Sequence, residues 1–440
     1  MLNKGQLFMP STYPRSMWIG FELMALLGLF VFAACDIINS DIGRKGEFLL
    51  LLATILSFAH IWKNDPDRWL YLILIFFLIY ISSINVWAKF HNPIELDHAN
   101  KARDHLRMFW FFIAGWWIGG SQRSAITLLT VACMGLVVSI LWHGGLSSWE
   151  ALFDGQRVDF GIHNAQHTAI YIETMILGLF TVGLRLLRID SIKKYLIPAT
   201  LWFFLVLFSI AVFWGTQTRQ AWLSLILVLM LILPAYTLYY KPKVFGKKNI
   251  LIILSLLGMF LVIGSINRPF SGIKNRIVKE SKAVVEYYYN KPNESIPITS
   301  ATIRLMLWDF AIDKISEKPL FGYGSATNKQ LLIKSDLPNY IRNNFGHFHN
   351  SYLELWIAYG VIAPLMFLGI LIYLTIRLIR SWKNGYTSND IAILSISWII
   401  IFFINNCFES YVNYRSGAYM MLIMGGIIYS LGIPVRRKNV

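Results

Sequence analysis

Long apolar segments recur along the whole chain and constrain its fold more than any other feature. Runs of about 18 or more apolar residues are typical of helices that cross a bilayer. Lipid admits only helices and closed barrels, and these runs are continuous rather than alternating. The composition agrees, because 56% of the 440 residues are hydrophobic and only 15% are charged. We therefore predict an all-α polytopic integral membrane protein.

The apolar segments predict about twelve transmembrane helices. They lie at 17–37, 47–62, 69–88, 108–120, 124–142, 168–187, 195–214, 220–240, 249–266, 351–376, 390–404 and 411–433. The predicted organisation is residues 1–266 with nine spans, a helical loop domain at 267–350, and residues 351–440 with three spans. The segment 108–120 is short for a full span, so we expect it to be broken or tilted.

The charge distribution orients these spans. The formal net charge is +16 at pH 7, and cytoplasmic loops of membrane proteins are rich in Lys and Arg. If the N-terminus lies in the cytoplasm, the inner segments hold about twice as many Lys and Arg residues as the short outer segments. We therefore expect both termini to be cytoplasmic and the loop at 267–350 to lie outside. This accounts for most of the basic excess without a nucleic-acid partner, and an anionic lipid-linked substrate would use part of the rest.

The sequence gives no sign of a cleaved signal peptide or of a functional cysteine site. The first apolar run, Trp18 to Cys35, lacks a small-residue cleavage site, so we interpret it as a retained helix. The three cysteines, Cys35, Cys133 and Cys407, are far apart, and their spacing fits neither a disulfide framework nor a metal site.

The long outer loop contains two segments with helical patterns, 276–290 and 301–316. In the second, helical spacing places one apolar face on Ile303, Met306, Leu307, Phe310, Ala311 and Ile315. Pro319 ends this helix, and the sequence "GYG" at 322–324 predicts a turn. We expect the helix to lie on the membrane face or to cover a cavity.

Two arginines on the predicted outer side are candidates for binding an anion. Arg219 lies at the start of an apolar helix, in "WGTQTRQAWLS", and a guanidinium presents a planar fork of donors that suits phosphate. The alternative is an interfacial arginine whose side chain reaches water. Arg304 lies at the edge of the apolar face of the second loop helix, where the alternative is an exposed surface charge.

The stretch "GHFHNSYLELWIAYG" begins with titratable residues and continues into an apolar helix. Asn350 is a favourable N-cap, which places His349 at the outer rim of the bundle. Histidine is the usual general base near neutral pH, although an interfacial polar residue is an equal alternative. Glu354, one turn into the helix, could orient the ring or a substrate hydroxyl. The pair His347 and His349 could instead bind zinc, for which two histidines without nearby cysteines are a weak signal.

A fourth polar stretch, "DGQRVDFGIHNAQHT" at 154–168, precedes another span. It contains Arg157, His163 and His167. Polar residues at this density beside the membrane are interpreted either as a binding rim or as a solvated loop.

Three of these stretches together resemble the O-antigen ligase/polymerase family of bacterial envelope glycosyltransferases. The motifs are T-x-T-R-Q-A-W at Thr216–Trp222, R-x-x-x-W-x-x-A-x-x-x-I-x-x-x-P-L-x-G-x-G at Arg304–Gly324, and H-N-S-Y-L-E-x-W-x-x-Y-G at His349–Gly360. Their order, the predicted topology and the long outer loop are similar too. The resemblance implies an enzyme of the bacterial inner membrane whose active site faces the periplasm.

The resemblance also implies roles and partners. Arg219 and Arg304 would bind a diphosphate, and His349 would be the essential catalytic histidine. Substrate-binding roles are expected for Arg157, His163, His167, Gln217, Asn350, Glu354 and Tyr323. The donor would be a glycan on undecaprenyl diphosphate and the acceptor lipid A-core, with membrane lipids as further partners. No cofactor is expected, and no carboxylate cluster indicates Mg²⁺.

The family includes more than one activity. Ligases transfer O-antigen to lipid A-core, polymerases extend the glycan on its carrier, and related oligosaccharyltransferases modify Ser or Thr of proteins. The chain length, the number of spans and the single long outer loop favour a ligase. A transporter is the alternative from another class, but it predicts charges near the midplane and repeated halves, and the sequence has neither pattern.

Overall fold

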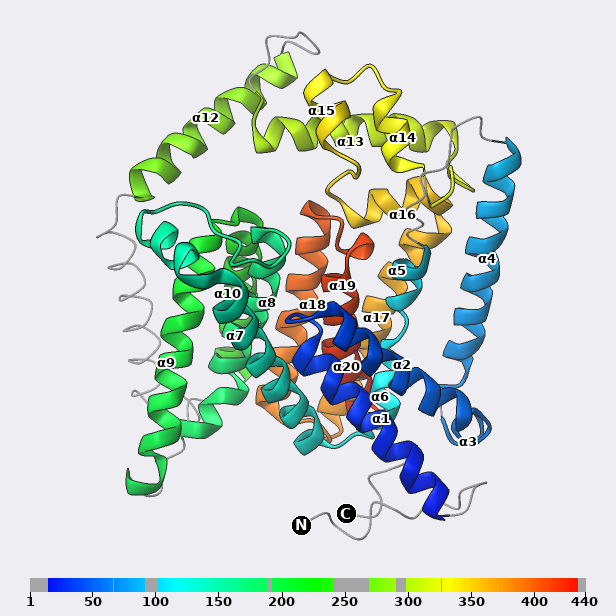
Figure 1. Ribbon diagram of the computed structural model, residues 1–440, viewed down its shortest axis with the longest axis vertical. Helices are drawn as coiled ribbons and strands as arrows, with labels where there is room; N and C mark the ends of the chain where they lie inside the picture. Colours follow the sequence, from blue (N-terminus) through cyan, green and yellow to red (C-terminus); the bar gives the residue numbers. More distant parts are fainter. Residues whose placement is uncertain are drawn as a thin grey trace.

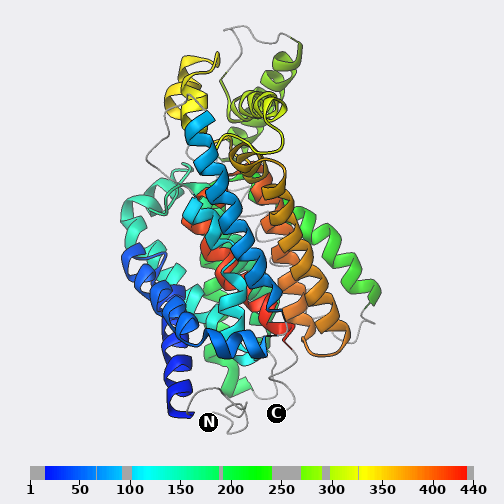
Figure 2. The same ribbon diagram turned by 90° about the vertical axis from the view of Figure 1, so that its right-hand side faces the viewer.

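The computed structural model describes residues 15–65, 67–91, 102–187, 192–239, 269–289, 298–325 and 327–433. Within these ranges all regular secondary structure is helical and there is no strand. Long helices run along one axis as a bundle, and a second group lies across one end of it (Figure 1). Figure 2 shows the same two-part arrangement from the side, with the yellow helices at the top. The structure therefore confirms an all-α polytopic architecture.

The chain forms its helices in the following order. The bundle contains α1 (Arg15–Cys35), α2 (Ser40–Leu56), α3 (Phe58–Asn64), α4 (Trp69–His91), α5 (Ala102–Arg107), α6 (Phe111–Ile118), α7 (Gln122–Phe153), α8 (Ala165–Phe180), the 3-10 helix η2 (Val182–Leu187), α9 (Ile192–Thr216) and α10 (Arg219–Tyr239). The group at the end, which we call the cap, contains α12 (Pro269–Tyr289), α13 (Ser300–Glu317), α14 (Asn328–Ile333) and α15 (Asn339–Asn344). The chain then returns through α16 (Ser351–Tyr359), α17 (Ile362–Lys383), α18 (Asn389–Phe408), the 3-10 helix η3 (Tyr411–Asn413), α19 (Arg415–Met420), the π-helix η4 (Met421–Gly425) and α20 (Gly426–Leu431).

Seven described helices are long and apolar enough to cross a membrane, or eight if the bent pair α2 and α3 counts as one broken span. The seven are Met17–Cys35, Trp69–His91, Gln122–Phe153, Ala165–Arg185, Ile197–Thr216, Ile362–Lys383 and Asn389–Phe408. The predicted count of twelve is therefore not confirmed. The predicted span 249–266 lies outside the described residues.

The predicted spans that differ from the observed helices are interrupted by local features of the backbone. The segment 351–376 divides into α16 and α17 because Gly360 adopts a φ of +73°, which is incompatible with a continuous helix. The segment 411–433 begins with the 3-10 helix η3, becomes α-helical only at Arg415, and then contains the π-helix η4. The short segment 108–120 contains α6, whose eight residues are all buried.

Small residues allow the bundle helices to approach closely. A Cβ atom added to Gly28 of α1 would lie 2.6 Å from the carbonyl oxygen of Gly46 in α2. A Cβ atom added to Gly115 of α6 would lie 2.6 Å from the carbonyl oxygen of Gly426 in α20. The core of the bundle is therefore set by backbone-to-backbone packing as well as by its large side chains.

Buried ion pairs connect helices that are distant in sequence. Arg415 at the start of α19 pairs with Asp36, just after α1. Arg107 in α5 pairs with Glu47 in α2 and with Asp104, each at 2.9 Å. The guanidinium of Arg107 is buried in these pairs. Arg103, on the same short helix, is exposed.

Helix α13 matches the predicted loop helix 301–316 to within one residue at each end. A reciprocal capping box between Thr299 and Thr302 starts it. Its apolar side packs into a small core of its own beneath the cap, which includes Met306, Leu307, Ala311, Ile315, Leu332 and Phe348. The other predicted loop helix, 276–290, is α12 and begins earlier, at Pro269.

The glycine motif after α13 fastens the cap to α16. The amides of Tyr323 and Gly324 donate to the carbonyl oxygens of Ile357 and Ala358, at 2.7 and 2.9 Å. Gly360 lies directly against the backbone of Leu320, so that a Cβ atom there would overlap it. This contact fixes the axis of α16, and with it the position of the polar residues that precede α16.

We expect Gly360→Ala to lower the thermal stability of the purified protein markedly. Alanine would carry a strained positive φ, which costs roughly 1–3 kcal/mol, and would also collide with the Leu320 backbone. The matched control is Gly369→Ala, a helical position with open space around it. Thermal unfolding in detergent measures both, and equal melting temperatures for the two variants would refute the role given to this contact.

Candidate functional site

A cavity of about 440 Å³ lies between the start of α10 and the cap helices α12 and α13. Its polar lining includes Arg157, Gln166, Gln217, Arg219, Glu280, Ser300 and Arg304. The structure thus brings together the two predicted diphosphate-binding arginines and Arg157, which are distant in sequence. Three guanidinium groups and one carboxylate give the cavity a net positive charge, which favours an anion.

Arg219 owes its position to the sharp turn between α9 and α10. Gln217 in this turn has a φ of +44° and donates to the carbonyl oxygen of Gly155 at 2.9 Å. The guanidinium of Arg219 then forms a two-pronged pair with the carboxylate of Glu280 from α12, with one N–O distance of 2.7 Å. A carboxylate therefore occupies the fork of donors that would suit a phosphate.

Arg304 and Arg157 are anchored by other contacts. Arg304 donates to the hydroxyl of Ser300 at 2.7 Å and to the carbonyl oxygen of Phe408 at 3.3 Å. Arg157 donates to the carbonyl oxygen of Thr216 at 3.1 Å. Burial lowers the pKa of Arg304, but guanidinium keeps its proton in proteins, so the charge stays in the cavity. The alternative of an exposed surface charge does not hold for Arg304.

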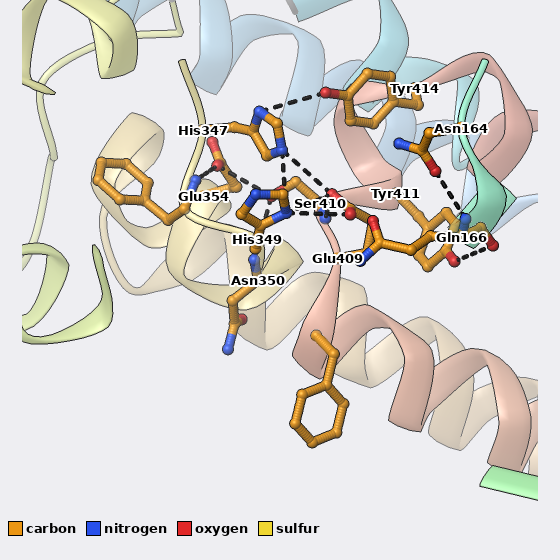
Figure 3. Close-up of polar contacts among 12 residues, drawn as sticks. Asn164, Gln166, His347, His349, Asn350, Glu354, Glu409, Ser410, Tyr411 and Tyr414 are labelled. Atoms are coloured by element: carbon orange, nitrogen blue, oxygen red, sulfur yellow. Dashed lines mark hydrogen bonds and ion pairs between the residues drawn. The ribbon is translucent and has the colours of Figure 1, made fainter. Parts of the chain in front are cut away.

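His349 lies just before α16 and contacts a carboxylate. Its backbone has a φ of +51°, which is uncommon for a residue other than glycine. Its Nδ1 atom lies 3.1 and 3.2 Å from the two carboxylate oxygens of Glu409 (Figure 3). Burial lowers the pKa of His349, and Glu409 opposes that shift only in part. This shift favours the neutral imidazole, which is the form that can accept a proton.

Glu409, at the end of α18, is a central residue that the sequence analysis missed. It is fully buried, accepts a hydrogen bond from the Ser410 amide, and lies 3.3 Å from a ring nitrogen of His347 and 3.1 Å from one of His349. Burial alone would raise the pKa of Glu409, but the attraction of His349 when it is protonated, together with hydrogen bonds from His347 and His349, brings this pKa well below its usual value. The available signal was an acidic residue at the end of an apolar span, which is rarely without a function.

Gln166 connects the cavity to this carboxylate. We assign its amide with the nitrogen facing Glu409, because in the reverse orientation the amide oxygen faces only acceptors and the nitrogen only donors. In this orientation Gln166 donates to Glu409 and accepts a hydrogen bond from Arg304 at 2.6 Å. Gln166 comes from the start of α8, in the polar stretch 154–168, and Figure 3 shows it beside Glu409. One chain of contacts therefore runs from Arg304 through Gln166 and Glu409 to His349.

Two predicted residues near His349 have other contacts. Asn350 is the N-cap of α16, as predicted, and its side-chain oxygen accepts from the amides of Tyr352 and Leu353. Glu354 is buried and contacts the Phe348 amide, the Ser410 hydroxyl and Asn328. The carboxylate that contacts His349 is thus Glu409 and not Glu354.

Of the remaining predicted residues, two histidines lie near the His347–His349 pair and one tyrosine lies under the cap. His163 and His167 pack with Tyr414, with ring centroids 4.7–4.9 Å apart, and the Tyr414 hydroxyl lies 3.3 Å from Nδ1 of His347. These two histidines therefore flank the His347–His349 pair. Tyr323 lies under the cap, where its hydroxyl donates to Glu317 at 2.5 Å, away from the residues that line the cavity.

We expect inorganic pyrophosphate to raise the melting temperature of the purified protein, because an anion that binds only the folded state stabilises it. Arg304→Ala should weaken this binding about tenfold or more, since it removes charge-assisted hydrogen bonds worth about 1.5–3 kcal/mol. Glu280→Gln should strengthen it, because the carboxylate that occupies Arg219 is neutralised.

The control for this measurement is Arg342→Ala, on α15 in the cap, where the side chain pairs with Asn339. Titrations followed by thermal shift give the apparent affinities. Wild-type affinity in Arg304→Ala, or weaker binding in Glu280→Gln, would contradict the assignment of the cavity to an anion.

Part of the chain is similar to a known protein family. Residues 203–368 match the sequence profile of a family described as O-antigen ligase. This segment contains Arg219, Arg304 and His349, whereas Glu409 lies beyond it.

Similar proteins cover only part of the chain. A Haemophilus influenzae protein described as uncharacterized is 29% identical over 210 residues, which span 45% of this chain and 48% of that protein. A Rickettsia felis protein named "Putative polysaccharide ligase" is 33% identical over 91 residues, 20% of this chain and 22% of its own length. A Rickettsia conorii protein of similar description is 33% identical over 90 residues, 19% of this chain and 22% of that protein. Residues 203–368 are thus similar to the O-antigen ligase family, within a chain that forms a polytopic helical membrane protein.

Proposed function

We propose that this chain is an O-antigen ligase, a glycosyltransferase of the bacterial inner membrane. It would move O-antigen glycan from undecaprenyl diphosphate to lipid A-core on the periplasmic face, as a step of lipopolysaccharide biosynthesis. The observation that carries the proposal is the chain of contacts from the arginine-lined cavity through Gln166 to the His349–Glu409 pair. A group that binds a diphosphate and a group that accepts a proton lie at the two ends of one polar site.

The arginines act on the leaving group. In the reaction, the bond between the anomeric carbon of the donor sugar and the phosphate oxygen breaks, and the diphosphate leaves with the electron pair. Arg219, Arg304 and Arg157 present fixed positive charge in a partly closed cavity, where such charge stabilises a developing anion strongly. Glu280 would be displaced from Arg219 as the diphosphate enters.

His349 acts on the acceptor. When Nδ1–H donates to Glu409, the lone pair lies on Nε2, which accepts the proton of the attacking sugar hydroxyl. General base catalysis of this kind contributes roughly 10²–10⁴-fold. The acceptor oxygen bonds to the anomeric carbon as the phosphate departs, so direct displacement inverts its configuration. No step requires a metal ion.

Backbone strain coincides with the same residues. In the described part of the chain, the non-glycine residues with positive φ are Phe160, His163, Gln217 and His349. Three of them are candidate site residues, and such strain concentrates where a side chain must be held in one orientation.

The alternatives differ in the acceptor. A polymerase or a protein O-oligosaccharyltransferase would use the same diphosphate cavity and the same base, so the geometry is equally compatible with their chemistry. A transporter requires charged residues along a path through the midplane, whereas the arginine cavity lies at one end of the bundle, against the cap.

The test is transfer in reconstituted vesicles containing undecaprenyl-diphosphate-linked O-antigen and lipid A-core, with EDTA present. Wild type should yield ladder-banded lipopolysaccharide, and His349→Ala should lower the rate by at least 10²-fold because the base is lost. The matched control is His91→Ala, an exposed histidine at the end of α4, which should keep the wild-type rate. Glycan lengthened on its carrier would indicate a polymerase, and an active His349→Ala variant would overturn the mechanism.

We further expect Glu409→Gln to lower kcat by about 10-fold or more while the KM for the donor stays near the wild-type value. The carboxylate orients the imidazole and does not contact the cavity directly, so base strength is lost but donor binding is kept. Glu286→Gln on α12 is the control. A rise in KM with unchanged kcat would instead place Glu409 in donor binding.

A further inference from the structure

We propose that His347, His349 and Glu409 form a binding site for one transition-metal dication, best matched by Zn²⁺, and that the bound ion blocks the base. The blocking rests on the proposed function, whereas the site itself does not. The three residues converge from two segments, the approach to α16 and the end of α18 (Figure 3).

The ligand atoms form a nearly equilateral triangle. His347 Nε2 lies 3.2 Å from His349 Nδ1 and 3.3 Å from Glu409 Oε1, and His349 Nδ1 lies 3.2 Å from the same oxygen. Tetrahedral zinc binds nitrogen and oxygen at about 2.0–2.2 Å, which separates neighbouring ligand atoms by about 3.3–3.5 Å. The triangle therefore has the dimensions of one face of a zinc tetrahedron.

Without a metal ion, no placement of the imidazole protons gives all three pairs of atoms in this triangle a good hydrogen bond. If both imidazoles donate to Glu409, their two N–H groups face each other across 3.2 Å. If one imidazole donates to the other, the donor loses its bond to the carboxylate. A dication at the centre satisfies all three lone pairs at once.

The surrounding contacts are those of a metal site. Tyr414 lies 3.3 Å from the second nitrogen of His347, and the Ser410 amide and Gln166 bind the carboxylate of Glu409. Such outer contacts fix the orientation of metal ligands. Two imidazoles and one carboxylate favour zinc or a similar transition metal over Mg²⁺ or Ca²⁺, which prefer oxygen ligands.

The charges predict a reversible site. Glu409 supplies one negative charge, and Arg304, joined to it through Gln166, opposes a dication. Three protein ligands also leave one coordination position for water. With zinc on Nδ1, a neutral His349 must carry its proton on Nε2, and that nitrogen can no longer accept the proton of an acceptor hydroxyl. Zinc would thus inhibit transfer.

The first test measures metal binding to the purified full-length protein, without any glycan. After EDTA treatment and dialysis, ZnCl₂ is titrated against a chromophoric chelator, and bound zinc is counted by elemental analysis. We expect one zinc per chain for wild type and for the control His91→Gln, and at least tenfold weaker binding for His347→Gln and Glu409→Gln. Melting temperatures without zinc verify that each variant is folded. No stoichiometric zinc in wild type, or wild-type affinity in His347→Gln, would overturn the site.

The second test measures transfer in the vesicle assay with and without ZnCl₂. Zinc should inhibit wild type by at least tenfold, EDTA should restore the rate, and His347→Gln should lose the zinc sensitivity relative to its own zinc-free rate. Zinc that binds without inhibiting, or that accelerates transfer, would overturn the inhibitory role. If the chain transfers no glycan at all, the proposed function fails, while the binding measurement still decides the site.

Discussion

The rest of the site depends on a fully buried carboxylate, Glu409, at the end of a membrane helix. An unpaired buried charge costs several kcal/mol, so the fold must supply it with donors. The donors come from distant parts of the chain: His347 and His349 from the end of the cap segment, Gln166 from the start of α8, and the neighbouring Ser410 amide. Because this one carboxylate requires several donors, three segments that are distant in the sequence meet at the site.

Two backbone contacts fix the positions of the two parts of the site, the His349 region and the arginine cavity. Gly322, Gly324 and Gly360 let the cap dock directly on the backbone at the end of α16, and this fixes the helix that follows His349. The sharp turn at Gln217 fixes Arg219 at the opposite side of the cavity. The glycines of the family motif are thus explained by close backbone contact, and the polar residues by charge. In the proposed reaction both sets are needed, because the arginines that hold the donor diphosphate and the base that activates the acceptor must keep a constant separation for the two substrates to react.

Local sequence patterns predicted individual helices and helix starts well, but they did not predict where long apolar segments are broken. Apolar periodicity placed α13 to within one residue, and N-cap preference placed Asn350 at the start of α16, because both signals depend on neighbouring residues alone. The breaks at Gly360 and at the π-helix near Met421 accompany close contacts with other parts of the chain, which the pattern of one segment does not contain. The count of twelve spans is not confirmed, and one of them, 249–266, lies outside the described residues. Glu409 is 60 residues from His349, and Glu280 is 61 from Arg219. Pairings at such separations are set by the fold, and a single sequence contains no local signal for them.

The Arg219–Glu280 pair gives the cap a role beyond covering the cavity. Three guanidinium groups facing one another would repel, and the carboxylate of α12 relieves that repulsion in the absence of an anion. A diphosphate carries more charge than one carboxylate and suits the same fork of donors, so in the proposed function it would compete with Glu280 for Arg219. Since Glu280 lies on α12, occupancy of the cavity and the position of that helix are coupled through this single ion pair. The cap is therefore expected to sense the donor through the electrostatics of the cavity, while the contact at Gly360 keeps its other end in place.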